Sequence, residues 1–151
     1  MLLKTHLAIN FLLSLLFLTY LQHKIIFVAM VLFATMLPDI DTIRSHIGKK
    51  VRVISMIINF FSKHRGFFHS LTFTLILSAV LLLISPFTAL AFFTGYSMHI
   101  LADSFTIEGI EPFWPLKQKI SGVIRTNGII EKILFFVFLA MDAVFLFAYL
   151  F

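Results

Sequence analysis

One imidazole and one carboxylate stand four residues apart near the end of a long apolar run, at His99 and Asp103. Residues at this spacing share one face of an α-helix and lie one turn apart. Ionisable side chains are costly in or near lipid, so their presence at the end of an apolar segment predicts a functional role. These two residues are therefore the first candidates for a binding or catalytic site.

Residues of the same chemical types stand at the ends of other apolar runs. His6 begins the first run, Asp39 and Asp41 end the second, and His64 and His69 precede the third. Neutral imidazoles and carboxylates suit zinc, and also manganese or iron. We predict that all of these residues meet at one end of a helical bundle and bind one or two divalent metal ions, with zinc expected first. Taken singly, His6 could instead be an interfacial or capping residue, and Asp39 could cap the next segment.

Arg65 and Glu108 are the predicted catalytic residues. A guanidinium beside His64 could neutralise a phosphate through paired hydrogen bonds, although a charge at this position could also serve only to orient the chain in a membrane. Glu108 and Glu111 are candidates for a general base or for further metal ligands. A two-metal site can activate water and stabilise the leaving oxygen of a phosphoester. Phosphoester hydrolysis is therefore the leading prediction for the chemistry.

The composition indicates an integral membrane protein. The chain has 151 residues, of which 60% are hydrophobic and 13% charged, and its mean hydropathy is +1.04. Soluble domains carry roughly 45–50% apolar and about 25% charged residues. The absence of cysteine excludes disulfides and thiolate ligands. The net charge of +5 fits membrane orientation better than nucleic-acid binding, because of where the cations lie.

Five apolar segments are expected to form membrane helices in a single all-α domain. These segments are residues 5–22, 25–38, 70–84, 87–103 and 129–151. Ser85 and Pro86 predict a turn between the third and fourth segments, since one kinked helix would need a far thicker membrane. The first two segments are short for the about 20 apolar residues that a span requires, so a shallow helical hairpin is the competing geometry.

The cations predict how the chain is oriented. Residues 42–68 combine basic and apolar residues at helical spacing, which is typical of a helix on the membrane surface; a loop helix packed on the spans is the alternative. With five spans, every Lys and Arg except Lys24 falls on the side of the N-terminus and of segments 42–68 and 104–128. The positive-inside rule then places the N-terminus and the metal site on the cytoplasmic face of a prokaryotic-type inner membrane, with the C-terminus opposite.

Two further residues carry predictions. Trp114 is expected to anchor the 104–128 segment at the membrane interface. Asp142 lies well inside the last apolar segment, where an acid is costly, and we predict that it pairs with Lys24 or His23 as a structural clamp.

Three motifs in order resemble the YdjM-like family of inner-membrane, metal-dependent hydrolases. They are residues 37–41, residues 64–71, and residues 95–106 with the Trp114-Pro115-Leu116 sequence that follows. The resemblance covers about residues 1–130 and implies a distant relation to the zinc-dependent phospholipase C and single-strand nuclease superfamily, and therefore phosphodiester chemistry. The residues that match the polar positions of the family pattern are His6, Asp41, His64, His69, His99 and Asp103.

The leading prediction is thus a membrane-bound, metal-dependent hydrolase that acts on a phosphoester at the level of the lipid headgroups. Membrane lipids are its expected partners, and phospholipid is the substrate class that this depth favours. A metal or proton transporter would use the same ligands as an entry site, but it should carry polar groups across the membrane. A non-catalytic protein would use the metal only to hold helix ends together.

Overall fold

The computed structural model describes residues 1–21, 23–41 and 66–151, and the named elements within these ranges are all helices. The elements are α1 (Leu3–Phe17), η1 (Leu18–Tyr20), α2 (Lys24–Met36), η2 (Pro38–Asp41), η3 (Phe67–His69), α5 (Leu71–Leu82), α6 (Pro86–Ser104) and α7 (Ile129–Leu150), where η denotes a 3₁₀ turn. The described part contains no strand, only two isolated β-bridges in residues 105–128. The predicted all-α class is confirmed for this part of the chain.

Each of the five apolar segments forms one α-helix, but the helices differ in length. Among the described residues, only Leu3–Tyr20 and Ile129–Leu150 are long and apolar enough to cross a membrane by themselves. The 12 residues of α5 and the 13 of α2 would extend only about 18–20 Å, against a hydrocarbon core of about 30 Å. The five-span bundle therefore stays a prediction. The surface helix expected within residues 42–68 falls almost entirely outside the described residues.

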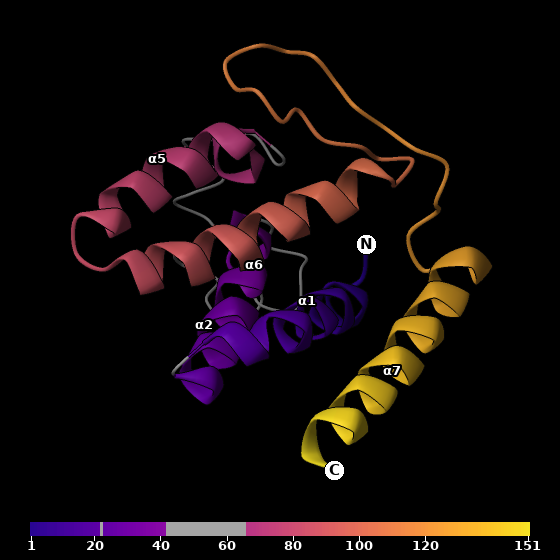
Figure 1. Ribbon diagram of the computed structural model, residues 1–151. Coiled ribbons are helices and arrows are strands. Elements are labelled where there is room, and N and C mark those ends of the chain that lie inside the picture. The colour runs from indigo at the N-terminus through magenta and orange to yellow at the C-terminus, as the bar shows by residue number, and fades with distance from the viewer. Residues whose placement is uncertain (22, 42–65) are drawn as a thin grey trace.

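The turn between α5 and α6 lies where Ser85 and Pro86 predict it. The Ser85 hydroxyl oxygen accepts a hydrogen bond from the Thr88 N–H, and Pro86 occupies the first position of α6, where its missing N–H costs nothing. Figure 1 shows α5 and α6 as an antiparallel hairpin that lies across the α1–α2 pair, with α7 to one side. This reversal returns the end of α6 to the neighbourhood of the N-terminus.

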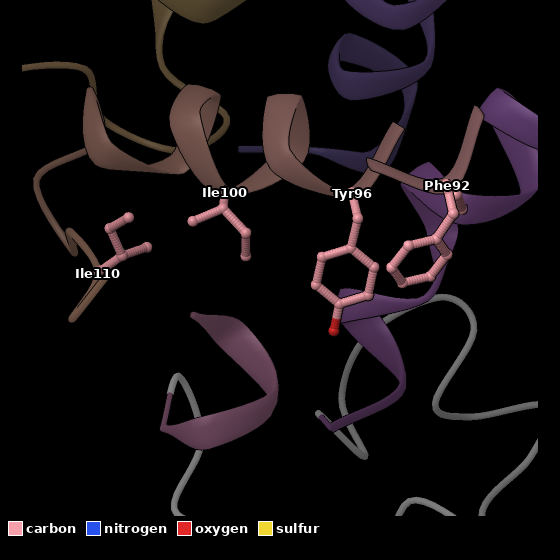
Figure 2. Close-up of a cluster of buried hydrophobic side chains, with 5 residues drawn as sticks. Phe92, Tyr96, Ile100 and Ile110 are labelled. Atoms are coloured by element: carbon pink, nitrogen blue, oxygen red, sulfur yellow. The ribbon is translucent and has the colours of Figure 1, made fainter. Parts of the chain in front are cut away.

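One buried face of α6 packs against α5. Phe92, Tyr96 and Ile100 follow each other at intervals of four residues, and Figure 2 shows them on the same side of the helix, with Ile110 from the following loop beside them. The Tyr96 hydroxyl also donates a hydrogen bond to the Phe68 carbonyl at 2.5 Å. The cluster therefore joins α6 to the turn that carries His69.

A second buried face of α6 crosses α2 at very short distance. A Cβ atom placed on Gly95 would lie 2.2 Å from the Val31 carbonyl oxygen, so only glycine permits this approach. The Thr35 hydroxyl donates to the Val31 carbonyl at 2.8 Å. The close crossing places His99, one turn beyond Gly95, beside the end of α2.

Helices α1 and α7 run in the same direction. The Glu131 carboxylate accepts the Leu2 N–H at one end of the pair. Near the other end, the ammonium of Lys24, the first residue of α2, donates to the Tyr149 hydroxyl at 2.6 Å. The predicted Asp142 clamp is therefore wrong in its partners, because Lys24 bonds Tyr149 and the described residues show no hydrogen bond or ion pair between Asp142 and His23. Asp142 is buried on α7, and its Oδ1 atom has no hydrogen-bond partner in the described structure.

Candidate metal centre

Three candidate ligands meet where α1 begins and α6 ends. His6 lies near the start of α1, and His99 and Asp103 lie in the last two turns of α6. One donor atom from each lies within 4.8 Å of the others, and all three residues are buried. His6 Nε2 is 3.2 Å from Asp103 Oδ1, close to the roughly 3.3 Å that separates two ligands of a tetrahedral ion bound at about 2.0–2.1 Å.

Two more predicted ligands adjoin this group. His69 Nε2 lies 3.1 Å from Asp103 Oδ2, and Asp39 Oδ1 lies 3.9 Å from His99 Nε2. His69 is the last residue of η3, which precedes α5, and Asp39 lies in η2, which follows α2. Burial raises the pKa of the Asp39 carboxyl above its ordinary value, as expected for an acid partly withdrawn from water.

The hydrogen bonds of His99 prepare one of its nitrogens for metal binding. Its Nδ1 lies 2.7 Å from the Thr35 carbonyl oxygen. A carbonyl only accepts, so Nδ1 carries the proton and the Nε2 lone pair is free to bind a cation. Metal-ligating histidines are commonly oriented in this way by a backbone carbonyl.

Unsatisfied nitrogens provide a second test of the fit. The Nε2 atoms of His6 and His99 are buried, and neither forms a hydrogen bond among the residues that the structure describes. The two rings stack with centroids 3.7 Å apart and planes 5° from parallel. Buried polar atoms without partners are costly, and a bound cation would remove that cost. The residues present therefore fit a divalent metal ion.

Asp103 is the electrostatic centre of the group. Its two oxygens face His6 and His69, and the amino nitrogen of Met1 forms an ion pair with Oδ1. The buried Asp103 carboxylate is thus paired with a cationic group, as it would be with a bound metal ion.

Comparison with known proteins assigns the family. The sequence model of the family described as YdjM inner membrane protein matches residues 1–151. The chain belongs to the YdjM inner membrane protein family. It is 37% identical over 91 residues to the inner membrane protein YdjM of Escherichia coli (strain K12), an alignment that covers 56% of this chain and 46% of that protein. It is 26% identical over 102 residues to YvsG of Bacillus subtilis (strain 168), covering 65% of this chain and 64% of that one.

The chain thus spans about half the length of the E. coli protein that it matches. No solved structure matches the sequence. Membership in the YdjM family, together with the two long apolar helices, supports the membrane location that the composition predicts.

Other predicted site residues of this YdjM-family protein are not tested by the geometry. His64 and Arg65 lie outside the described residues, and Asp41 is described only as the last residue of η2. Glu108 is exposed, and its Oε2 accepts a hydrogen bond from the Thr126 hydroxyl at 3.0 Å. The roles of these residues, and of Glu111, stay predictions.

The structure also shows two supporting residues that the sequence analysis does not name, one bonded to His99 and one at the neighbouring starts of α1 and α7. Thr35 contributes a backbone carbonyl, which no side-chain type can signal. Glu131 is buried, and its two oxygens accept the N–H groups of Leu2 and Asn127, so that it joins the starts of α1 and α7. The helix dipole favours an acid in the first turn of a helix, so the position of Glu131 in the sequence could have indicated a role at the start of α7.

Trp114 supports the turn that carries His69. Its carbonyl accepts the Thr72 hydroxyl at 2.9 Å, and its ring contacts the Phe67 ring with centroids 4.9 Å apart. The Leu71 N–H bonds the Pro112 carbonyl at 2.9 Å in the same region. The loop of residues 105–128 is thereby attached to η3.

We expect the Trp114→Ala variant to lose stability because the ring contact with Phe67 disappears; an aromatic pair contributes about 0.5–1.5 kcal/mol beyond its buried area. Thermal unfolding followed by circular dichroism measures the loss. Phe113→Ala removes a neighbouring aromatic ring of similar exposure, 48% against 45%, that has no ring contact among the described residues, so it should change the midpoint less. Equal effects of the two substitutions would contradict a specific role for Trp114.

Proposed function

We propose that this protein is a membrane-bound, metal-dependent hydrolase of phosphoesters. The observation that carries the proposal is the convergence of donor atoms from His6, His99 and Asp103 within 4.8 Å in a buried site. Imidazole and carboxylate donors suit zinc, with manganese or iron as further candidates. A divalent ion held there would supply Lewis-acid activation of water and would neutralise charge on a phosphoester.

The residues of the chain have separate tasks in this proposal. Asp103, His6 and His69 bind the positive charge, and the Thr35 carbonyl keeps His99 in the tautomer that can bind it too. Arg65 would hold the phosphate through its guanidinium group, and Glu108 would act as general base. The sequence motifs imply a distant relation to the zinc-dependent phospholipase C superfamily, and that relation would favour phosphodiester chemistry in particular.

Phospholipid is the substrate class that we propose. The donors lie at the start of one long apolar helix and at the end of α6. The ends of membrane helices lie at the level of the headgroups, where the phosphodiester of a lipid is found. The parallel course of α1 and α7 and the distribution of cations support a cytoplasmic position for this end.

The metal content of the purified protein is the first test. We expect wild type to retain one or two divalent ions when measured by inductively coupled plasma mass spectrometry, and His99→Ala combined with Asp103→Ala to retain almost none. His23→Ala removes an exposed histidine outside the group and should not change the content. Equal, near-zero metal in all three proteins would contradict the proposal.

Phospholipid turnover is the second test. Purified protein with added zinc or manganese should release a cleaved headgroup or diacylglycerol that mass spectrometry identifies, and the double variant should not. If removal of metal unfolds the bundle and no lipid is consumed, the metal is structural and the protein is not a hydrolase.

A transporter is the second candidate, and one observation favours it. Asn10 and Ser14 follow His6 on the same face of α1 and are fully buried, and Asp142 is buried on the neighbouring α7. Polar groups therefore continue from the candidate site into the apolar length of the bundle. If Asp142→Asn abolished metal uptake into proteoliposomes while metal stayed bound at the cluster, transport would replace hydrolysis as the function.

A further inference from the structure

A cavity lies where the polar loop of residues 105–128 joins α7. Its volume is about 620 Å³, and its lining comes from residues 123–132. Cavities of about 300–1,000 Å³ accommodate small-molecule ligands. None of the candidate metal ligands lines it, so it is a separate feature from the metal centre.

The charge of this cavity is positive. Arg125 and Lys132 line it, and both side chains are exposed. The carboxylate nearest in sequence, Glu131, is buried, and both of its oxygens are engaged with backbone N–H groups. One acid, Glu108, lies at the edge through its hydrogen bond with the lining residue Thr126. Two cations against one edge carboxylate favour an anionic ligand.

Three apolar side chains also line the cavity, beside the polar Thr126 and Asn127, and they are open to the surroundings. Val123, Ile129 and Ile130 are exposed by 82%, 77% and 54%. Ile129 also begins α7, the 22-residue helix that is long and apolar enough to span a membrane. The cations and the exposed apolar side chains therefore lie together at the place where a membrane helix would enter the hydrocarbon core.

We propose that this cavity binds the headgroup phosphate of an anionic phospholipid. Arg125 and Lys132 bind the phosphate, and Ile129 and Ile130 contact the first acyl carbons below it. A soluble anion would explain the two cations but not the apolar side chains beside them. The proposal does not depend on hydrolysis at the metal centre.

Native mass spectrometry of the full chain in detergent tests the proposal with phosphatidylglycerol and phosphatidylcholine of the same acyl chains. We expect wild type to bind phosphatidylglycerol on the order of tenfold more tightly, because each surface cation contributes appreciably to anionic-lipid binding. Arg125→Gln combined with Lys132→Gln should remove this preference. Lys117→Gln combined with Lys119→Gln removes the same charge from exposed positions outside the cavity and should keep it.

Three results would overturn the proposal: no preference in wild type, equal loss of preference in the two double variants, or displacement of the lipid by free glycerol 3-phosphate at equal concentration. The circular dichroism spectrum of each variant shows whether it is folded. If the double variant of the cavity does not fold, Arg125→Gln and Lys132→Gln are measured singly, and each should reduce the preference.

Discussion

Replacing Asp103 by asparagine is expected to abolish metal binding while leaving the size of the side chain unchanged. Asp103 faces His6 and His69 through its two oxygens, and an amide cannot supply the negative charge that a divalent cation requires. Losing an outer-shell partner of a metal site typically weakens binding about 10–100-fold, so losing this central carboxylate should weaken it more than about 100-fold. Competition with a chromophoric zinc chelator measures the affinity.

Asp142→Asn is the matched control for this experiment. It makes the same chemical change at another buried aspartate, on a helix that contributes no ligand to the His6–His99–Asp103 group. We expect its zinc affinity to equal that of wild type. If Asp103→Asn bound zinc as tightly as Asp142→Asn, the cluster would not be the metal site.

The histidines and aspartates of the site could be predicted because their types contrast with their surroundings. An imidazole or carboxylate at the end of an apolar run is costly, and His99 and Asp103 also share a helix face. The turn at Ser85 and Pro86 follows from local chemistry, since serine caps and proline begins a helix. That turn brings the end of α6 back to the start of α1. The convergence of His6, His69, His99 and Asp103 was predicted from these local signals together with the five-span arrangement, which itself stays a prediction.

Contacts that depend on the packing of distant helices could not be predicted. The Thr35 carbonyl reaches His99 only because α2 and α6 cross closely, and a backbone carbonyl is present at every residue. Asp142 was assigned the wrong partner because the sequence does not show which residue of α7 lies beside Lys24; in the structure it is Tyr149, about two turns further along the helix. The number of spans also stays open, because α2 with 13 residues and α5 with 12 are shorter than the about 20 residues of a membrane span.

The Gly95→Ala variant should be destabilised, against the intrinsic preference of the helix. Alanine is favoured over glycine inside a helix by about 1 kcal/mol, so propensity alone predicts a more stable protein. The added Cβ would lie 2.2 Å from the Val31 carbonyl oxygen and 3.0 Å from the Ala34 Cβ. The carbonyl belongs to the backbone and cannot rotate away, so α2 and α6 must separate. Overpacking of this kind typically costs about 1–3 kcal/mol and sometimes more, which outweighs the gain in propensity.

The same substitution should weaken metal binding, because separation of α2 from α6 lengthens the 2.7 Å contact between His99 Nδ1 and the Thr35 carbonyl. The imidazole then loses the partner that sets its tautomer, and losses of this kind lower metal affinity about 10–100-fold. Thermal unfolding and zinc titration measure the two effects. Ser97→Ala, at a half-buried position of the same helix, should change neither. A higher unfolding temperature for Gly95→Ala would mean that helix propensity outweighs the contact and that the helices do not cross this closely. Unchanged zinc affinity in a destabilised variant would mean that the Thr35 carbonyl does not prepare His99 for the metal.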